Sequence, residues 1–260
     1  MPRCRLRSEA LGAQLKRKDV RPTSEVHLSK RLTELESLHG ACVAAIPSLT
    51  AENVDQRLFT LTMAYSSLIE LGGSVALLAR QSHWTAVPSV VRTMLETYVD
   101  LCNLASDTEY LEFMNARESR DARALLSAIG NGGSALTQSL AGQIDLDDVQ
   151  MQLLMDETES SSKRALSAKD RFSRAGLYDA YEIVYRLLSS DAHSNLSALR
   201  GRHAEPRGDG LGLTLHSERD ESQMAFMLGL SKEMLGQGAV MVYGALEADM
   251  PAGLSACFKS

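Results

Sequence analysis

Apolar positions recur every three or four residues along most of the chain, which is the spacing of amphipathic helices. The pattern predicts two long helices in the first third of the sequence, from about Ser24 to Ile46 and from about Ala51 to Gln81. Pro47 ends the first of them, because proline cannot donate the backbone hydrogen bond that would continue the helix. These two helices are expected to pack as an antiparallel hairpin.

The same periodicity continues in four later segments. Pro88 suits a first helical turn and opens one of them. The others are expected at about Thr108 to Ile129, around Arg186, and at about Glu221 to Glu247. The fold class predicted from this pattern is an all-α multi-helix bundle with long antiparallel helices.

Three stretches depart from the pattern. Asp145 to Arg174 is rich in charge and serine, which indicates largely exposed helix and the least core-like part of the chain. Arg200 to Gly210, "RGRHAEPRGDG", is expected to be a polar basic loop. "LGLTLH", residues 211–216, alternates like a short β segment, but the sequence suggests no obvious partner strand.

Domain boundaries are few, since no internal repeat or low-complexity tract interrupts the chain. We expect a basic flexible arm at residues 1–23, a single helical-bundle domain at 24–250 and a C-terminal tail at 251–260. The arm carries seven Lys or Arg residues against Glu9 and Asp19, on a chain whose net charge is −6. Such an arm could touch nucleic acid or a membrane surface, or it could be a solvated terminus.

Composition fits a soluble protein, with 44% apolar and 5% aromatic residues. The four cysteines lie far apart, which favours reduced thiols and a cytoplasmic location. Leu58 to Ala79 carries only one charge, Glu70, but its serines, threonines and glycines favour a buried central helix over a membrane span. No membrane association is expected.

Candidate chemistry begins with "YRLLSSDAHSN", Tyr185 to Asn195. The helix expected around Arg186 has an apolar surface from Leu177 to Ala192 except for a narrow sector that holds Glu182, Arg186, Ser189 and His193. Arg186 and His193 are two turns apart, so an unbroken helix would place their backbones about 10 Å apart, within reach of one phosphate. The alternative is an ordinary exposed salt bridge between Glu182 and Arg186 at the i,i+4 spacing.

A second polar band follows Pro88. Apolar residues cover most of that helix and leave Arg92, Glu96, Asp100 and Asn103 in one strip. A polar strip on a deeply buried helix must be paired or line a cleft. Both alternatives stay open: an internal Arg92–Glu96 ion pair that orients neighbouring helices, or a cleft.

The two polar segments together carry a resemblance. "VRTMLETYVDL", Val91 to Leu101, combined with "YRLLSSDAHSN", resembles an uncharacterised family of bacterial helical proteins, one of the domain-of-unknown-function families. Its members carry an Arg and a Glu four apart on one helix and a Tyr…Ser…His segment on a later helix. The resemblance spans roughly Ala64 to Leu199 and implies no activity.

A looser resemblance is to the HEPN superfamily, helical proteins of prokaryotic toxin and antiphage systems. Many of these are metal-independent RNases with an Arg, four to six residues, and a His; Arg186 and His193 have six residues between them, although Leu187 stands where the superfamily commonly has a polar residue. The resemblance implies a homodimeric endoribonuclease without cofactor, with RNA as substrate and an antitoxin as a further partner.

Under that resemblance His193 would act as general acid or base, and Arg186 would hold the scissile phosphate. The supporting polar network would be Arg92, Glu96, Glu182 and Ser189. Further phosphate contacts would come from Arg200, Arg202 and Arg207, with His203 in the same segment.

Other chemistries find little support in the sequence. The six histidines show no metal-binding spacing, and no Walker loop, GxGxxG or GxSxG motif occurs. Two non-enzymatic alternatives remain open. One is a helical protein-interaction module whose polar residues form a structural network, and the other is a small-molecule sensor with a cleft lined by Arg92 and Glu96.

Overall fold

The computed structural model of the chain describes residues 24–49, 55–130, 163–192, 195–208, 210–214 and 220–258. The basic arm predicted at residues 1–23 therefore lies outside the described residues. Internal contacts divide the chain into two compact units, residues 1–106 with 171–260 and residues 107–170. The single domain expected at 24–250 stays a prediction.

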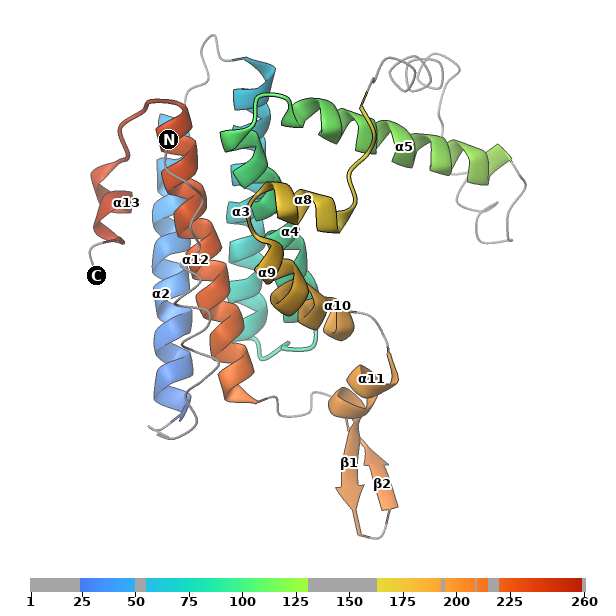
Figure 1. Cartoon of the computed structure of the whole chain (residues 1–260). Helices are drawn as coiled ribbons and strands as arrows, with labels where there is room; N and C mark the ends of the chain where they lie inside the picture. The colour runs from blue at the N-terminus through green and yellow to red at the C-terminus, as the bar shows by residue number, and fades with distance from the viewer. Residues whose placement is uncertain are drawn as a thin grey trace. The chain divides into compact units, whose positions relative to one another are not determined.

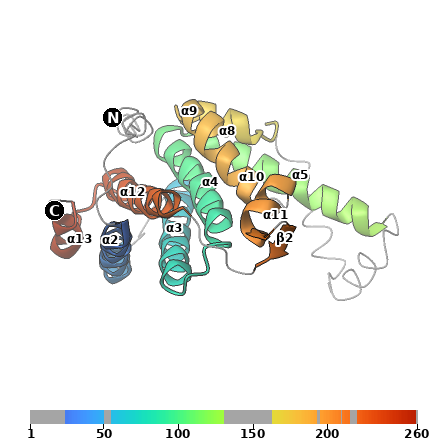
Figure 2. The same ribbon diagram turned by 90° about the horizontal axis from the view of Figure 1, so that it is seen from below.

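Four long helices form the body of the larger unit. They are α2 (Ser24–Ala45), α3 (Gln56–Arg80), α4 (Val87–Ser106) and α12 (Glu221–Ala245). α12 packs against the other three, and α3 also packs against α2 and α4 (Figures 1 and 2). α3 runs antiparallel to α2 and α4, as the colour gradient of Figure 1 shows. The predicted all-α fold with long antiparallel helices is confirmed.

Side-chain caps and a proline set the ends of these helices. The Asp55 carboxylate accepts a hydrogen bond from the Leu58 N–H at 2.7 Å at the start of α3. Asp220 accepts one from the Ser222 N–H at 2.9 Å at the start of α12. α2 passes into a short 3-10 turn, Ile46–Ser48, that contains Pro47. Each cap satisfies a backbone donor that the helix itself leaves unpaired.

The core lies between the four long helices. The buried face of α3 includes Leu61, Tyr65, Leu68 and Val75. Gly238 of α12 lets these helices approach closely, because a Cβ there would lie 3.1 Å from Leu68 Cδ1. By length and composition α3 could also cross a membrane, but this is weak evidence for a membrane span, because a core helix of a bundle passes the same test. The cytoplasmic location stays a prediction.

A bent helical segment packs on the outer side of α4. It consists of α8 (Ala168–Arg174), α9 (Tyr178–Ala180), the π-helical turn η2 (Tyr181–Tyr185) and α10 (Arg186–Ala192). α10 lies against α4 in both views (Figures 1 and 2). The π turn interrupts regular α-helical geometry directly before Arg186, so the helix that carries the "YRLL" segment is not a uniform α-helix.

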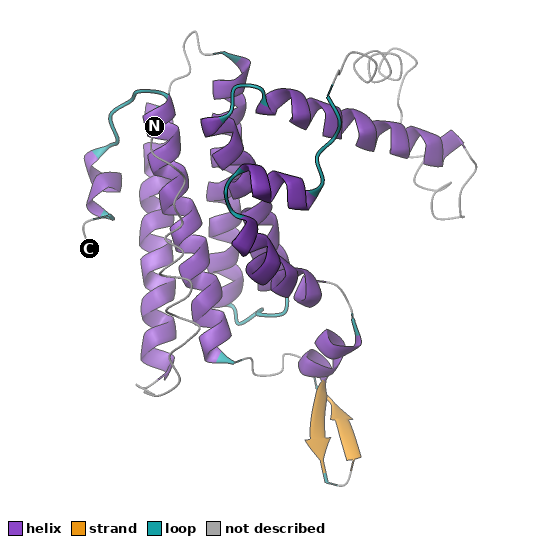
Figure 3. Ribbon diagram, viewed as in Figure 1, coloured by secondary structure: helices purple, strands orange, loops and turns teal. Residues whose placement is uncertain are grey.

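The segment after α10 differs from the sequence prediction. α11 spans Leu196–His203, and β1 (Ala204–Arg207) pairs antiparallel with β2 (Gly210–Leu213) in a small hairpin (Figure 3). The polar loop predicted at Arg200 to Gly210 is therefore wrong. The predicted β segment has its partner within that supposed loop, where charged residues and a proline hide the strand pattern.

Two further pieces complete the described fold. The C-terminal tail contains a short helix, α13 (Ala252–Ala256), which packs on α2 and buries Leu254. In the smaller unit, α5 (Tyr110–Gly130) carries Phe113, and Lys163 lies over its ring at 5.3 Å. Of the segment predicted to be exposed, residues 145–162 lie outside the described residues. Residues 163–174 keep exposed surface as predicted except at Arg171 and Phe172, which are buried, so the prediction is wrong at these two positions.

Candidate functional site

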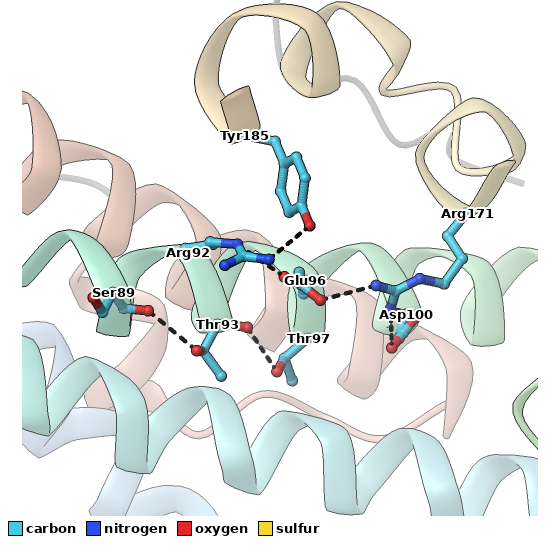
Figure 4. A network of polar contacts seen from close by, with 8 residues as sticks. All are labelled: Ser89, Arg92, Thr93, Glu96, Thr97, Asp100, Arg171 and Tyr185. Carbon is cyan, nitrogen blue, oxygen red and sulfur yellow. Dashed lines mark hydrogen bonds and ion pairs between the residues drawn. The ribbon is translucent and has the colours of Figure 1, made fainter. Parts of the chain in front are cut away.

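The polar band predicted on α4 contacts side chains from α8 and η2 (Figure 4). Asp100 and Asn103 are buried, whereas Arg92 and Glu96 keep 25% and 29% of their side-chain surface exposed. The band therefore runs from a half-open end to a closed end along one helix. A buried carboxylate such as Asp100 requires a cationic or hydrogen-bonding partner.

Arg171 from α8 supplies that partner (Figure 4). Its guanidinium donates to both carboxylate oxygens of Asp100, at 2.9 and 2.8 Å, and to Glu96 Oε2 at 2.9 Å. The Asn103 side-chain amide donates to the Arg171 backbone carbonyl at 3.0 Å. One arginine thus joins both carboxylates of the α4 band and fixes α8 against α4.

Sequence reasoning missed Arg171, because it lies in a stretch that looked exposed. One signal was available. The α4 band holds two carboxylates and one arginine, so burying it requires a further positive charge from elsewhere in the chain. Arg171 precedes Phe172, a fully buried aromatic residue.

Arg92 connects the half-open end of the band to η2. Its Nε lies 3.3 Å from Glu96 Oε1, and its Nη2 donates to the Tyr185 hydroxyl at 2.9 Å. The guanidinium carbon also lies 5.0 Å from the centre of the Tyr185 ring, within the range of a cation–π contact. The predicted Arg92–Glu96 pair is thus present and is extended by Tyr185 and Arg171.

Ser189 lies on α10, about one helical turn after Tyr185. Its hydroxyl oxygen is buried and has no hydrogen-bond partner among the described residues. Arg92 Nε is also buried without a geometrically adequate hydrogen bond, although it is within ion-pair distance of Glu96. Unsatisfied polar atoms of this kind mark a place where water or a ligand group can bind.

Glu182 and Arg186 form a separate ion pair at 3.0 Å, one turn apart. Their side chains are 36% and 66% exposed, so this pair is much more open than the α4 band. His193 follows Ala192, the last residue of α10, and lies outside the described residues. The structure therefore brings Glu182 to Arg186 and Arg92 to Glu96, as two separate pairs.

The expected phosphate-binding arginines lie on α11 and β1. Arg200 is exposed, and Arg202 has a buried Nε without a hydrogen-bond partner among the described residues. Arg207 pairs with Glu205 across the exposed side of β1, at 2.6 Å from Nε to Oε1. His203 Nδ1 lies 3.2 Å from the Thr214 carbonyl oxygen. These four residues thus lie on α11 and β1, in one segment of the larger unit.

A metal site and a ligand-binding cavity are two other kinds of site. In the part of the chain that the structure describes, no group of His, Cys, Asp or Glu residues is arranged to hold a metal ion. A cavity of about 470 Å³ lies in the smaller unit, lined by Ala116, Ser119, Arg120, Arg123, Lys163, Arg164 and Ala165. Neither Arg92 nor Glu96 lines this cavity, so it is not the cleft that the sensor alternative requires.

Comparison with known proteins gives one match. The profile of a family of unknown function, DUF5677, covers residues 59–211, which is more than half of the chain. The chain belongs to this family. The match includes α4, η2, α10 and α11 and is consistent with the resemblance to a domain-of-unknown-function family over about Ala64 to Leu199. No curated protein and no solved structure matches the chain.

Proposed function

We propose that the chain is a metal-independent endoribonuclease that uses Arg186 and His193. The observation that supports this is the position of Arg186: its guanidinium is 66% exposed at the start of α10, outside the internal network around Arg171. Among the described residues Arg186 pairs with Glu182, and an exposed guanidinium in such a surface pair can turn to a phosphate at little energetic cost. Arg92, by contrast, is held by Glu96 and Tyr185.

The reaction follows from RNA chemistry. His193 takes the proton of a 2′-hydroxyl, and the 2′-oxygen attacks the adjacent phosphorus. The bond from phosphorus to the 5′-oxygen breaks, and that oxygen leaves with a proton delivered by an acid. The products are a 2′,3′-cyclic phosphate and a 5′-hydroxyl end, and Arg186 stabilises the charge that develops on the phosphate.

A second histidine would suit the acid step, and in a homodimer the second copy supplies it. Arg92 and Glu96 then act indirectly. Through Tyr185 and Arg171 they hold η2 and α8 against α4, so that Arg186 extends from a fixed segment. Arg200, Arg202 and Arg207 would contact the RNA backbone further along.

The test is cleavage of end-labelled RNA by purified protein in the presence of EDTA. Wild type is compared with Arg186→Ala, His193→Ala and a matched control, Glu182→Gln. The control breaks the same surface ion pair as Arg186→Ala but leaves the guanidinium in place. We expect wild type and Glu182→Gln to cleave, and each of the other two variants to lose about 100-fold or more in rate.

Three outcomes would overturn the proposal. Wild type is inert; His193→Ala cleaves as wild type does, which indicates a contaminating nuclease; or Glu182→Gln and Arg186→Ala lose activity equally, which assigns Arg186 to the ion pair alone. Product ends are checked at the same time, because a 3′-phosphate-type end without metal separates this chemistry from metal-dependent hydrolysis.

The setting that goes with this activity is a bacterial toxin or antiphage system. Expression of wild type in a bacterial host should then slow growth, whereas expression of His193→Ala at the same level should not. Equal growth of both strains, with both proteins soluble, counts against a toxic nuclease.

A second candidate function, a protein-interaction module, is favoured by the hairpin. Leu211 and Leu213 are two positions apart on β2, so their side chains lie on the same face of the hairpin. They are 77% and 83% exposed. Two exposed leucines on a two-stranded sheet favour a partner, and the expected homodimer supplies one. Sedimentation of wild type and of Leu211→Ser/Leu213→Ser tests this: a dimer that becomes monomeric supports it, and an unchanged sedimentation coefficient contradicts it.

A further inference from the structure

The cavity in the smaller unit is lined on one side by a single face of α5. The residues that α5 contributes have the i, i+3, i+4 and i+7 spacing of one helix face; they are Ala116, Ser119, Arg120 and Arg123. The first two are small and buried, whereas the two arginines are exposed. Small side chains on a helix face leave room beside the helix, and here the room amounts to about 470 Å³.

The rest of the described lining comes from the segment before α8, namely Lys163, Arg164 and Ala165. With Arg120 and Arg123, four of the described lining residues are cationic, and no carboxylate is among them. Like charges around one space repel each other, and a space lined by one sign of charge concentrates the field that attracts the opposite sign. The composition of the lining therefore favours an anionic occupant.

Lys163 has a structural role in addition to its charge. Its ammonium lies 3.1 Å from a Glu109 carboxylate oxygen and 3.9 Å from one of Glu112. It also lies over the Phe113 ring. These contacts attach the segment before α8 to the first turns of α5, so Lys163 would hold this position with or without a ligand.

Arg120 and Arg164 are held more loosely. Arg120 pairs with Asp121, its neighbour in the sequence, at 2.8 Å, and its side chain is 57% exposed. Arg164 is 87% exposed and lies 4.0 Å from Asp170, at the outer limit of an ion pair. Asp170 also accepts a 2.7 Å hydrogen bond from the Ser167 hydroxyl. Exposed ion pairs contribute little free energy, so both guanidinium groups can turn to a ligand at low cost.

We infer that this cavity binds a small molecule through its phosphate groups, with Arg120 and Arg164 as the phosphate-binding residues. A guanidinium presents two parallel N–H donors that match two oxygens of one phosphate. Cavities of about 300–1,000 Å³ are typical of small-molecule sites, so a nucleoside diphosphate is an occupant of suitable size and charge.

This site is additional to the proposed nuclease and does not rest on it. The cavity belongs to the smaller unit, whereas Arg186 belongs to the larger one. A polynucleotide is a less suitable occupant, because single strands are bound along grooves that follow the backbone and offer aromatic rings to the bases. The described lining contains no aromatic residue.

Isothermal titration calorimetry of the full chain tests the inference. The probes are ADP, inorganic phosphate and adenosine, each without added metal ion. Arg120→Gln and Arg164→Gln remove one charge each and keep a polar side chain. The matched control is Arg80→Gln, because Arg80 is 59% exposed and pairs with Glu36 but lies on α3 in the larger unit. Melting temperatures check that every variant is folded.

We expect ADP to bind wild type more tightly than inorganic phosphate does, and adenosine not to bind. Arg120→Gln and Arg164→Gln should each weaken ADP binding about tenfold, which is typical for the loss of one charge-assisted contact. Arg80→Gln should bind ADP within about twofold of wild type, because its ion pair is outside the cavity.

A further variant is expected to increase affinity. Asp121→Asn removes the carboxylate that competes with a ligand for the Arg120 guanidinium, so it should strengthen ADP binding about threefold. Misfolding would not produce such a gain. An affinity equal to that of wild type would contradict the role of Arg120.

Four other results would overturn the inference. Neither ADP nor phosphate binds; adenosine binds as tightly as ADP; the two cavity variants bind ADP as Arg80→Gln does; or single-stranded RNA binds through Arg120 and Arg164 and ADP does not compete with it. The cleavage assay in EDTA is read separately, because loss of ADP binding leaves the roles of Arg186 and His193 unchanged.

Discussion

Two arginine–glutamate pairs on neighbouring helices have the same sequence spacing and different environments. Arg92 and Glu96 on α4 lie 3.3 Å apart and are 25% and 29% exposed. Arg186 and Glu182 lie 3.0 Å apart and are 66% and 36% exposed. Sequence spacing predicts an i,i+4 contact in both cases and does not distinguish them.

The difference comes from what packs on each pair. Arg171 and Tyr185 cover the α4 pair and turn it into a network that joins three segments of the chain. The α10 pair faces outward and stays much more exposed. The first pair is therefore expected to serve stability, and the second is available for function.

The largest expected effect follows from removing the centre of the network. Arg171→Met leaves the carboxylates of Asp100 and Glu96 without their shared cation, and loss of one partner from a buried ion pair costs about 3–5 kcal/mol. Urea unfolding measures the change. Arg174→Ala, an exposed arginine on the same helix, is the control and should change stability little.

A double variant sharpens this result. Arg171→Met/Asp100→Leu removes one positive and one negative charge together, so it should recover part of the lost stability. If Arg171→Met costs no more than Arg174→Ala, the network does not stabilise the fold, and the contrast between the two pairs is lost.

The next effect concerns Tyr185, which links the network to η2. Tyr185→Phe removes the hydroxyl that accepts from Arg92 but keeps the ring under the guanidinium, so we expect a loss of about 1 kcal/mol. A double-mutant cycle with Arg92→Met in urea unfolding measures the coupling. A coupling energy of zero would show that this contact does not hold η2 against α4.

A third ion pair, between α2 and α12, gives a pH-dependent intermediate case. Lys232 donates a hydrogen bond to Glu34 at 2.9 Å and lowers the pKa of that carboxyl, and burial opposes this only in part. The stabilisation is present above the unfolded-state pKa of about 4.3 and is lost as the pH falls through the lower folded-state pKa.

Glu34→Gln should therefore cost about 0.5 kcal/mol near pH 7 and almost nothing once the pH is well below the folded-state pKa of Glu34. Unfolding in urea across this pH range measures it, with Glu70→Gln on the exposed side of α3 as the control. A cost that is the same at all pH values would contradict the ion-pair explanation.

The smallest effect on stability is expected at the exposed pair. Arg186→Ala and Glu182→Gln should each change the free energy of unfolding by less than about 0.5 kcal/mol, because exposed pairs contribute little. Thermal unfolding measures this alongside the cleavage assay. A loss above about 2 kcal/mol for Arg186→Ala would place this residue with the α4 network and remove the contrast.

Much of the fold could be predicted from local patterns. The long helices begin and end within a few residues of the expected positions, because their apolar spacing, Pro47 and the acidic residues at their starts act locally. For the hairpin, only the second strand was predicted. β2 has a clear alternation of apolar and polar residues, whereas β1 contains charged residues and a proline. The sequence of either strand alone does not specify which strand it pairs with.

The candidate site divides in the same way. The bands that contain Arg92 and Arg186 could be predicted because each is a polar strip on an apolar helix. The role of Arg171 could not be predicted, because Arg171 lies far from α4 in the sequence and within a charged stretch. Which of two equal i,i+4 pairs is covered depends on contacts between distant segments, and helical periodicity contains no information about them.

The sequence by itself determined the helical class, the positions of the long helices and the two polar strips, since these depend on interactions within a few residues. Only the tertiary structure decided that Arg171 neutralises the α4 carboxylates, that Tyr185 stacks between Tyr181 and Arg92, and that Arg186 stays open. The physical reason is burial: a charge inside the protein must find its partner wherever the chain brings one, and a charge in water need not.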